Sequence, residues 1–504
     1  MSDQLISSKE VSINPFTLQE HPLPGTISDS DQIRAFLAEN NGKKCVVVQG
    51  LGFVGAVMSV ICANALTEEY AVIGIDLPDK KNYWKIKAIN EGNFPLVAED
   101  PKIEVYYQQA RKKKNLLATY DTIAYTYADI VIVDINLDVE KNSTELNDLI
   151  SFNINLDLFK KAIKTIGENC KEDVLVLIET TVPPGTSEKL IYPIINECLA
   201  KRGMATDQWK LGHSYERVMP GPNYIDSIQN FYRVFSGINE ESANATERFL
   251  KTIIKTETYP LTKLESMTAS EMAKVLENSY RAMNISFMVE WSRFAEEAGV
   301  NLYDVVAAIK MRPTHQNMML PGLGVGGYCL TKDPLLASWA RQYFFDGDKL
   351  ADSERGVIKN DKMPYLAFEY LSNFVSNYEG AKVLVLGVCY REDVGDTRSS
   401  PVEIFYNCLA NKGAIISLHD PHVSFWEEKE TKVETDLGVI FQDNYDIIVV
   451  GTKHSIYKNN QKLIEKIVDN KARIIYDPVG LFNDQEIVKI SETKIIKVLG
   501  RGDI

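Results

Sequence analysis

A glycine-containing stretch around residue 50 constrains the fold of this chain more than any other feature. Residues 44–49 (KCVVVQ) form a largely apolar segment, typical of a strand buried in a parallel sheet. They run directly into Gly50-Leu51-Gly52-Phe53-Val54-Gly55, and an apolar helix is expected over residues 56–66. A second strand, residues 71–75, ends in Asp76. This order of strand, glycine loop, helix, strand and acid predicts a Rossmann βαβ unit that binds a dinucleotide.

Each residue of the glycine loop has a physical task. Gly50 makes the tight turn, Gly52 lets the backbone approach the pyrophosphate, and Gly55 lets the helix pack closely. Phe53 and Val54 fill the remaining positions at the helix N-terminus, where backbone N–H groups face the phosphates. All five residues are therefore expected cofactor contacts.

The acid after the second strand favours one dinucleotide over another. Asp76 is expected to bind the adenosine ribose hydroxyls, and its charge would repel the 2′-phosphate of NADP. The predicted cofactor is therefore NAD. Lys81 is a further candidate contact to the phosphates or the ribose, with a solvated lysine as the alternative.

The composition indicates a large globular protein of a reducing compartment. The chain has 504 residues, enough for about three domains. Its net charge of −14 argues against nucleic-acid binding. Seven cysteines without CxxC spacing indicate reduced thiols, and no apolar leader opens the sequence. The longest apolar runs are far too short to cross a membrane. We therefore expect a cytoplasmic protein with neither a membrane nor a nucleic-acid partner.

Strand and helix patterns keep alternating after the first unit. Strands are expected at residues 130–134 and 174–178. Ligands of open α/β sheets lie at the carboxyl ends of strands, so Thr181 is a candidate cofactor contact. A threonine bonded only to nearby backbone is an equal alternative. A later loop holds Glu216 and Arg217, an adjacent acid and base whose alternative role is a surface salt bridge.

A helical pattern then continues from residue 262 to residue 297. Apolar residues recur at helical spacing without glycine or proline, and so long a helix exceeds a normal globular element. It is expected to connect two domains and to offer an apolar face to a partner helix, which predicts a homodimer. Lys274, Asn278 and Arg281 share one face of this helix, either as solvated residues or as the lining of a polar cleft.

A second glycine-rich stretch carries a candidate nucleophile. Residues 321–334 (PGLGVGGYCLTKDP) place Cys329 after four glycines, Gly326 among them, and just before Lys332 and Asp333. A glycine turn that presents a thiol beside a cation and an anion suits nucleophilic catalysis. The alternative is a tight turn around a buried structural cysteine.

The C-terminal section has the pattern of a second Rossmann-like domain. Strands are expected at residues 381–386, 414–419 and 446–450, but the section has no GxGxxG. Such a domain is expected to bind a different phosphate compound. Arg391 and Arg398 are the candidate phosphate ligands, and solvated arginines are the alternative.

These patterns together predict an α/β protein with two doubly wound Rossmann-like domains joined by a long central helix. We place an N-terminal extension at residues 1–43, the NAD-binding domain at 44–260, the central helical region with the cysteine loop at 261–345, and the C-terminal domain at 346–504. No metal site is predicted, because His419-Asp420-Pro421-His422 is expected to form a strand-end turn.

Six motifs, in order along the chain, resemble the UDP-glucose/GDP-mannose dehydrogenase family of nucleotide-sugar 6-dehydrogenases. They are the fingerprint at 50–55, TVPPGT at 181–186, ERVMPG at 216–221, the helix pattern of Lys274, Asn278, Arg281 and Asn284, GVGGYCLTKDP at 324–334, and GDTRSSP at 395–401. The cysteine motif is the most specific of the six.

The resemblance implies a four-electron oxidation of the C6 hydroxyl of a UDP-hexose to a uronic acid, a precursor for polysaccharide synthesis. Two NAD molecules would be used in turn. Cys329 would hold the aldehyde as a thiohemiacetal and then the acid as a thioester. Lys274 would stabilise the developing oxyanion beside Asn278, and Asp333 would help to activate water.

The resemblance also implies contacts to cofactor, water and substrate. Thr181 and Glu216 are further candidates for thioester hydrolysis, and Arg398 resembles an arginine that reaches the cofactor from the third domain. Arg312 resembles one that reaches the substrate of the neighbouring subunit. The expected substrate contacts are Arg217, Lys274, Asn278, Arg281, Arg312, Gly326 and Arg391.

Departures from the family pattern leave the sugar open. Residues 135–138 (INLD) replace a threonine-proline stretch, so one hydroxyl contact to NAD is missing, and Arg391 replaces a lysine. ERVMPG resembles enzymes of N-acetylated UDP-hexosamines. In the cysteine motif, the Lys332-Asp333 pair resembles UDP-glucose enzymes, whereas the Asp333-Pro334 pair resembles the enzymes of N-acetylated sugars. Two other functions remain as alternatives: a non-catalytic sensor of NAD and a nucleotide sugar, and a two-electron NAD-dependent hydroxy-acid dehydrogenase. Neither of them needs a nucleophilic Cys329.

Overall fold

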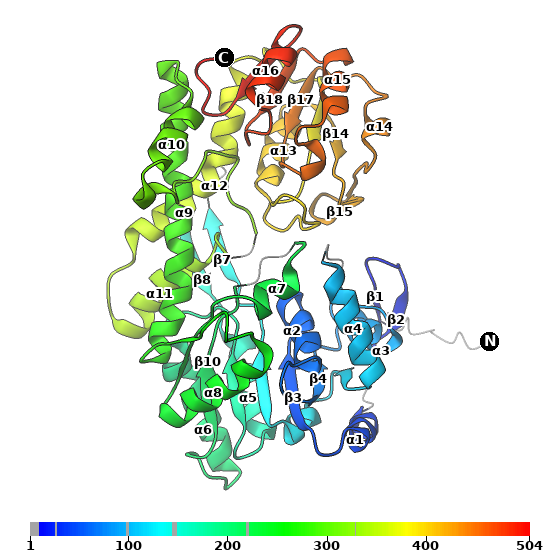
Figure 1. Ribbon diagram of the computed structural model, residues 1–504, viewed down its shortest axis with the longest axis vertical. Helices are drawn as coiled ribbons and strands as arrows, with labels where there is room; N and C mark the ends of the chain where they lie inside the picture. The colour runs from blue at the N-terminus through cyan, green and yellow to red at the C-terminus, as the bar shows by residue number, and fades with distance from the viewer. Residues whose placement is uncertain (1–9, 26–27, 97–99, 144–148, 218–220, 328) are drawn as a thin grey trace, which may run out of the picture. The chain divides into compact units, whose positions relative to one another are not determined.

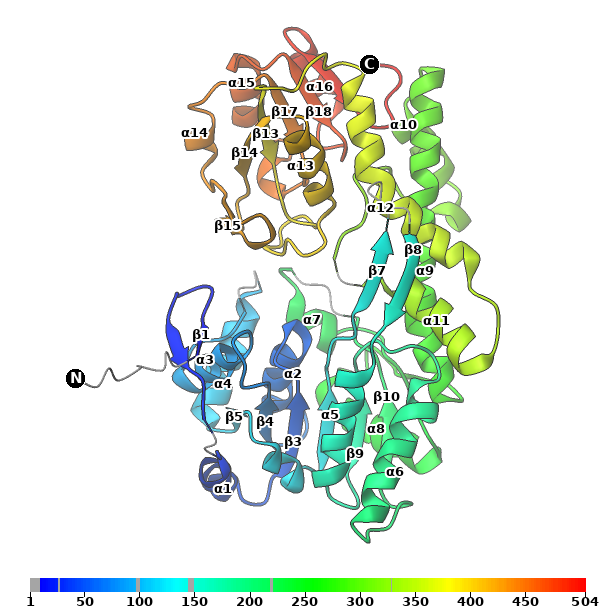
Figure 2. The ribbon, with the colours of Figure 1, turned by 180° about the vertical axis from the view of Figure 1, so that it is seen from behind.

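Figures 1 and 2 show the computed structural model, which describes residues 10–25, 28–96, 100–143, 149–217, 221–327 and 329–504. Parts of two predicted motifs, residues 218–220 and Tyr328, lie outside the described residues, as do residues 1–9 of the extension. The chain forms two compact units. The first consists of Met1–Asp138 and Ile154–Lys274, and the second of Val139–Asn153 and Val275–Ile504.

The first unit is built on an eight-stranded sheet in the order β12-β11-β10-β9-β6-β3-β4-β5. Only the pair β10–β11 is antiparallel among these strands. From β5 to β10 the order is that of a dinucleotide-binding Rossmann fold, with its switch point between β3 and β6. The strands are β3 (Lys44–Gln49), β4 (Tyr70–Ile75), β5 (Leu116–Thr119), β6 (Ile130–Val133), β9 (Leu175–Ile178), β10 (Lys210–His213), β11 (Val234–Gly237) and β12 (Thr262–Lys263).

Helices cover both faces of this sheet (Figures 1 and 2). One continuous hydrophobic core joins the sheet to helices α2 (Phe53–Ala63), α3 (Tyr83–Glu91), α4 (Pro101–Lys113), α7 (Tyr224–Gln229) and α8 (Glu240–Ile253). Helices α5 (Asp157–Asn169) and α6 (Tyr192–Lys201) pack against each other on the other face (Figure 2). The strands β3 and β6 are almost wholly buried, as expected for central parallel strands.

The extension before this sheet has structure of its own. β1 (Val11–Ile13) and β2 (Glu20–Pro22) form an antiparallel hairpin. It is followed by α1 (Ser30–Glu39).

The second unit contains a five-stranded parallel sheet in the order β14-β13-β17-β18-β19. Numbered within the domain, this is the doubly wound order 2-1-3-4-5, so its switch point lies between β13 and β17. The strands are β13 (Lys382–Leu386), β14 (Ile415–His419), β17 (Ile447–Val450), β18 (Ile474–Asp477) and β19 (Ile495–Val498). The helices of this sheet are α13 (Pro401–Asn411), α14 (Leu437–Ile440), α15 (Gln461–Asp469) and α16 (Asp484–Ser491), and a small hairpin is formed by β15 (Phe425–Trp426) and β16 (Thr431–Lys432).

Long helices make up the rest of the second unit (Figure 1). They are α9 (Met267–Ala298), whose first turns belong to the first unit, α10 (Leu302–Lys310), α11 (Asp333–Phe345) and α12 (Ala351–Ser372). A hairpin of β7 (Val139–Ser143) and β8 (Leu149–Ile154) is tied to α12 by an ion pair of 2.8 Å between Lys141 and Asp361.

The predicted α/β architecture with two Rossmann-like sheets and a long central helix is confirmed. The helix expected from residue 262 begins only at Met267, because Thr262 and Lys263 pair with β11 as an edge strand. The division into four domains stays a prediction. Among the described residues, no helix is both long enough and apolar enough to cross a membrane.

Candidate active site and cofactor site

The glycine loop has the shape that a dinucleotide requires. Gly50 has a φ of +95°, and a Cβ there would lie 2.5 Å from the carbonyl oxygen of Asp134. A Cβ on Gly55 would lie 1.8 Å from the Gly50 carbonyl oxygen, so any larger residue would push α2 away from the loop. A Cβ on Gly52 would meet open space, which leaves its backbone accessible to a ligand. Gly52 is also the N-cap of α2, whose first turn contains Phe53 and Val54, so the loop fits NAD.

Asp76 follows β4 at the same edge of the sheet. One of its oxygens accepts a hydrogen bond of 3.1 Å from the Leu51 backbone N–H, which ties the acid to the glycine loop. The Nζ of Lys85 lies 3.5 Å from that oxygen. Burial raises the pKa of the Asp76 carboxyl, and the Lys85 ammonium opposes this rise. The predicted contact Lys81 is exposed, so Lys85 is the lysine that sequence reasoning missed here.

A buried acid, a half-buried acid and a buried arginine lie beneath this edge, and the sequence analysis did not single them out. Glu179 directly follows β9, is fully buried, and accepts a hydrogen bond from the guanidinium of Arg233, which is 2% exposed. Asp134 directly follows β6. Burial raises the pKa of both carboxyls, the charge of Glu216 adds to this rise, and the Arg233 guanidinium opposes it. The sequence did contain a signal for these two acids, because each directly follows an apolar strand that is expected to be buried in the parallel sheet.

The loop that contains Thr181 is fixed by an acid from α9. Thr181 itself is 8% exposed. Further along the loop, the buried carboxyl of Glu271 accepts backbone N–H bonds of 2.6 Å from Gly185 and 2.9 Å from Ser187. Burial raises the pKa of Glu271 to about 8, although the hydrogen bonds from Ser187 and Gly185 oppose this rise.

Lys274 and Glu216, both predicted as catalytic, lie together in the first unit. The Lys274 ammonium donates a hydrogen bond of 3.1 Å to the Glu216 carbonyl oxygen and lies 3.9 Å from the Glu216 carboxylate. It also lies 5.4 Å from the centroid of the Tyr215 ring. The guanidinium carbon of Arg217 lies 5.8 Å from the centroid of the Tyr215 ring and 5.8 Å from the centroid of the Phe231 ring. The result is a nearly buried cation held by a ring and by oxygen atoms.

The glycine stretch before Cys329 is clamped on two sides within the second unit. The side chain of Asn360 on α12 accepts from the Val325 N–H at 2.7 Å and donates to the Val325 carbonyl oxygen at 2.9 Å. A Cβ on Gly326 would lie 2.5 Å from both the Ser399 carbonyl oxygen and the Tyr390 Cβ. The stretch therefore needs glycine because the C-terminal domain packs directly on its backbone.

Cys329 and Asp333 are joined by the turn that starts α11. The Cys329 carbonyl oxygen accepts N–H bonds of 3.2 Å from Lys332 and 2.9 Å from Asp333. Asp333 is fully buried, and its carboxylate accepts a hydrogen bond of 2.6 Å from the Asn278 amide. The structure thus brings three predicted catalytic residues into one loop-and-helix assembly, with the Cys329 side chain partly exposed.

A cavity of about 220 Å³ opens at the switch point of the C-terminal sheet. Its lining includes Gly322, Gly324, Arg391, Thr452 and Lys453. The cavity therefore combines glycine backbone with two cationic side chains, which suits a phosphate-containing ligand.

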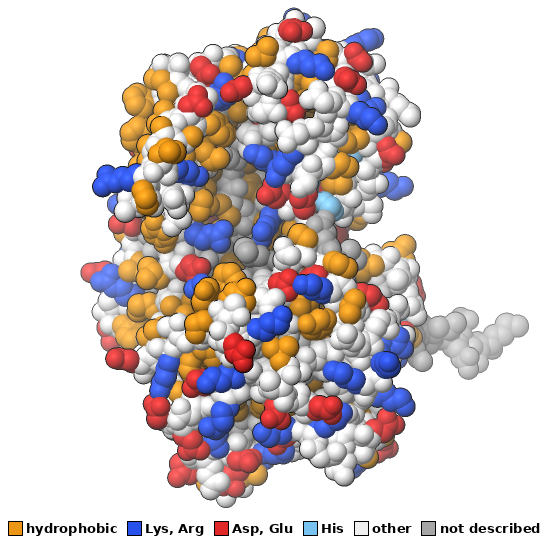
Figure 3. All heavy atoms as spheres, viewed as in Figure 1, with side chains coloured by type: hydrophobic (Ala, Val, Ile, Leu, Met, Phe, Trp, Pro, Cys, Tyr) orange, Lys and Arg blue, Asp and Glu red, His pale blue; other side chains and the backbone are white. Residues whose placement is uncertain are grey.

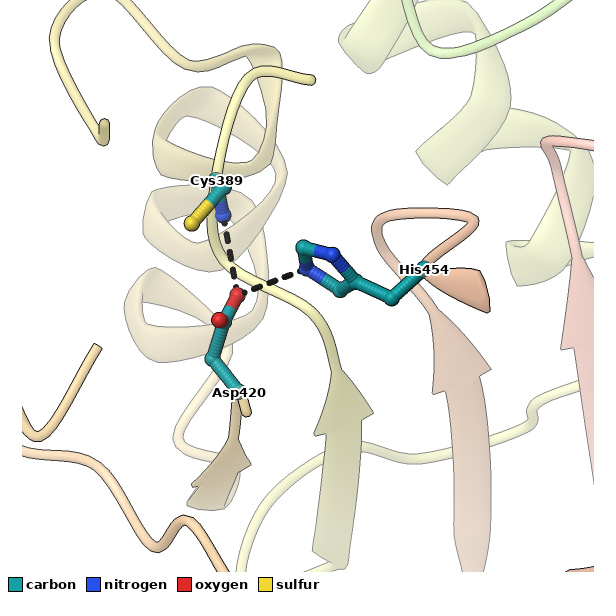
Figure 4. A group of neighbouring side chains, drawn as sticks. All are labelled: Cys389, Asp420 and His454. Carbon is teal, nitrogen blue, oxygen red and sulfur yellow. Dashed lines mark hydrogen bonds and ion pairs between the residues drawn. The ribbon is translucent and has the colours of Figure 1, made fainter. Parts of the chain in front are cut away.

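An aspartate braces the loop that borders this cavity (Figure 4). One carboxylate oxygen of Asp420 accepts N–H bonds from Val388 and Cys389 and a bond of 3.0 Å from His454 Nε2. Burial alone would raise the pKa of the Asp420 carboxyl. Hydrogen bonds from His454, Val388 and His422 outweigh this effect and hold the pKa at about 2. Burial and the Asp420 charge raise the pKa of the Cys389 thiol, which disfavours a thiolate there.

The remaining predicted arginines lie at the surface of the second unit. Arg398 makes two hydrogen bonds, of 2.9 Å and 2.7 Å, to the carboxylate of Asp396, and its side chain is 43% exposed. Arg281 and Arg312 are both exposed. Their contacts to cofactor or substrate stay predictions.

Three family models match successive parts of the chain. The UDP-glucose/GDP-mannose dehydrogenase NAD binding domain matches residues 43–255, the central domain of the same family matches 268–351, and its UDP binding domain matches 384–484.

Individual relatives agree with these models over nearly the whole chain. The UDP-N-acetyl-D-mannosamine dehydrogenase of Methanococcus vannielii is 30% identical over 91% of this chain and 97% of its own length. The UDP-N-acetyl-D-glucosamine 6-dehydrogenase of Pseudomonas aeruginosa is 26% identical over 88% of this chain and 98% of its own length. The solved structure of a UDP-D-ManNAc dehydrogenase from Pyrococcus horikoshii is 26% identical, covers 91% of this chain and 100% of its own, and gives a TM-score of 0.74. The chain therefore belongs to the UDP-glucose/GDP-mannose dehydrogenase family and is an NAD-dependent nucleotide-sugar dehydrogenase.

Proposed function

We propose that this enzyme oxidises the C6 hydroxyl of a UDP-N-acetylhexosamine, with UDP-N-acetyl-D-mannosamine as the first candidate, to the corresponding uronic acid. The overall reaction converts one primary alcohol, one water and two NAD⁺ into one carboxylate, two NADH and three protons. Its product is a precursor for polysaccharide synthesis. The partly exposed Cys329 at the end of its clamped glycine stretch is the observation that carries the proposal.

The chemistry requires a residue that retains the half-oxidised product. NAD, when bound at the glycine loop of the first unit, supplies the hydride acceptor for each oxidation. The Cys329 thiolate adds to the C6 aldehyde and forms a thiohemiacetal, so the aldehyde cannot leave before the second oxidation. Loss of hydride from that carbon leaves a thioester on the Cys329 sulfur. Water then cleaves the C–S bond, which releases the carboxylate and restores the thiol.

Residues of both units are given separate tasks in this scheme. Lys274 stabilises the negative oxygen that develops at C6, since a nearly buried ammonium acts strongly on a nearby charge. Asn278 orients Asp333 through the hydrogen bond of their side chains, and Asp333 takes a proton from the attacking water. Glu216 and Thr181 are further candidates for positioning this water. A two-electron dehydrogenase would need neither the thiol nor the water-activating acid.

The C-terminal cavity is the proposed site for the UDP part of the substrate. Arg391 and Lys453 in its lining provide positive charge for the diphosphate, and the glycine backbone at Gly322 and Gly324 allows close approach. The match of this domain to a UDP binding domain supports uridine over guanosine.

Substrate preference gives a direct check of the proposed sugar. With UDP-N-acetyl-D-mannosamine, kcat/KM is expected to exceed that for UDP-glucose by at least about 10-fold, because a site built to bind the N-acetyl group leaves polar groups unpaired without it. NADH formation should be followed with both sugars, with UDP-N-acetyl-D-glucosamine and UDP-N-acetyl-D-galactosamine, and with GDP-mannose as the control for the base. A clear preference for UDP-glucose would contradict the assignment.

We also propose that the enzyme is a homodimer formed through an apolar face of α9 and α10. Figure 3 shows hydrophobic side chains gathered over these helices. Six large hydrophobic side chains on α9 are exposed, and the rings of Phe287, Trp291 and Phe294 contact one another along the helix. The six are Met272, Leu276, Tyr280, Phe287, Trp291 and Phe294. Such a face on a soluble enzyme is typical of a subunit interface. In such a dimer, Arg312 at the end of α10 is the proposed contact to the partner's substrate.

Replacing Trp291 by glutamate tests this interface. The wild-type enzyme is expected at twice the chain mass of 56.8 kDa in light scattering coupled to size exclusion, and Trp291→Glu at the single-chain mass. A buried, unpaired carboxylate at the centre of an apolar interface costs several kcal/mol, about enough to dissociate a micromolar dimer. Glu297→Gln, an exposed change on the same helix, should remain dimeric. A Trp291→Glu protein that keeps twice the chain mass would place the interface elsewhere.

A further inference from the structure

The N-terminal hairpin lies before residue 43, where the first family model begins, and no role described above uses it. Its strands pair from Val11 with Pro22 to Ile13 with Glu20, and it packs against α3 (Figures 1 and 2). The central residue of β1, Ser12, is fully buried. A polar side chain at the buried position of a short hairpin needs a specific partner.

Ser12 is bonded to the loop that connects β4 to α3. Its hydroxyl donates to the Lys80 carbonyl oxygen at 2.9 Å and accepts from the Trp84 backbone N–H at 3.0 Å. The N-cap residue of α3, Asn82, makes no side-chain capping bond. Ser12 therefore satisfies, from a distant part of the chain, one of the N–H groups that the first turn of a helix leaves without a partner.

Other contacts of the hairpin go to the same loop and to the first turn of α3. The rings of Phe16 and Trp84 meet edge to face with centroids 5.8 Å apart, and Glu10 pairs with Lys80 at 3.1 Å. The indole N–H of Trp84 donates to the Lys81 carbonyl oxygen at 3.0 Å, which closes the loop on itself. The loop is thus held between the hairpin and its own helix.

This loop begins at Asp76, the acid assigned to the ribose, and the first turn of α3 after the loop carries that acid's partner. Lys85 directly follows Trp84, and its ammonium lies 3.5 Å from the Asp76 carboxylate. β4, which carries Asp76, already pairs with β3 and β5, so the hairpin adds no strand to the sheet. We propose that the hairpin is a strap that fixes Lys85 and Asp76 for the adenosine ribose of NAD, with Ser12 as a positioning residue. The proposal rests on the assignment of Asp76 to the ribose.

Binding of ADP-ribose tests the strap apart from catalysis. Isothermal titration of Ser12→Ala should show a dissociation constant about 3- to 10-fold weaker than wild type, the effect of one lost buried hydrogen bond. A chain without residues 1–24 should lose at least as much. In kinetics, KM for NAD should rise while kcat at saturating NAD and KM for the sugar stay unchanged. Glu20→Gln, an exposed change in β2, is the matched control, and UDP is the reference ligand that should bind all variants equally.

Two results would distinguish a wrong strap proposal from a wrong assignment of Asp76 to the ribose. If Asp76→Ala weakens ADP-ribose binding but Ser12→Ala and the shortened chain stay within two-fold of wild type, the strap is wrong and Asp76 keeps its role. If Asp76→Ala itself leaves ADP-ribose binding unchanged, both the ribose assignment and the strap are wrong. A loss of UDP binding together with ADP-ribose binding would show general unfolding in place of positioning, and would also overturn the proposal.

Discussion

Cys329→Ala is expected to lower the rate of uronate formation by at least about 10⁴-fold, the scale seen when a catalytic nucleophile is removed. Without the thiol, no thiohemiacetal forms, and a free aldehyde is a poor hydride donor. Dissociation constants for NAD and for UDP should stay within two-fold of wild type, because the glycine loop of the first unit and the C-terminal cavity do not contain the Cys329 side chain. Uronate should be quantified by chromatography, with the two ligands measured by calorimetry.

A second cysteine gives the matched control. Cys408 on α13 is also partly exposed, but burial raises the pKa of its thiol to about 11, so it has no thiolate character at neutral pH. Cys408→Ser should retain kcat within about two-fold, since the change is small and Cys408 is not part of the cavity lining. Uronate production by Cys329→Ala at a rate near that of wild type would exclude the thioester route.

Lys274→Met is expected to lower kcat by about 10²- to 10³-fold, the usual effect of removing one group that stabilises an oxyanion. Methionine approximates the length and packing of the lysine stem over the Tyr215 ring, so the change removes mainly the charge. KM for the sugar should change little, because the charge on the C6 oxygen develops only in the transition state. Steady-state kinetics at saturating NAD measures this separation of kcat from KM.

A second lysine of the first unit, which forms an ion pair at the surface, controls for the loss of one positive charge. Lys263 pairs with the exposed Glu240, and Lys263→Met should leave kcat unchanged. A Lys274→Met enzyme with kcat within two-fold of wild type would show that the ammonium does not act on the developing charge.

The sequence predicted those parts of the fold and site that depend on local pattern. The strand, glycine loop, helix and terminal acid stand in fixed order, so the Rossmann unit could be placed from residues 44–76 alone. The clustering of Cys329 with Asp333 also follows from spacing, because a short turn joins them at the start of α11.

Contacts between distant residues could not be predicted in this way. Asn360 clamps Val325 from a helix 35 positions away, and nothing in either local pattern indicates the pairing. Lys85 and not Lys81 faces Asp76 because α3 begins at Tyr83, and one turn of that helix directs residue 85 back toward the strand end. The late start of the predicted long helix has a similar cause, since edge pairing with β11 overrode the helical pattern at Thr262.

The stoichiometry of NADH to sugar tests the central claim most directly. Limiting UDP-N-acetyl-D-mannosamine should be converted with excess NAD, NADH read by its absorbance, and the remaining sugar nucleotide and uronate quantified by chromatography. A four-electron oxidation through Cys329 predicts two NADH for each sugar consumed and one uronate formed, with no aldehyde released. One NADH per sugar with accumulation of an aldehyde would contradict the account and would make the enzyme a two-electron dehydrogenase.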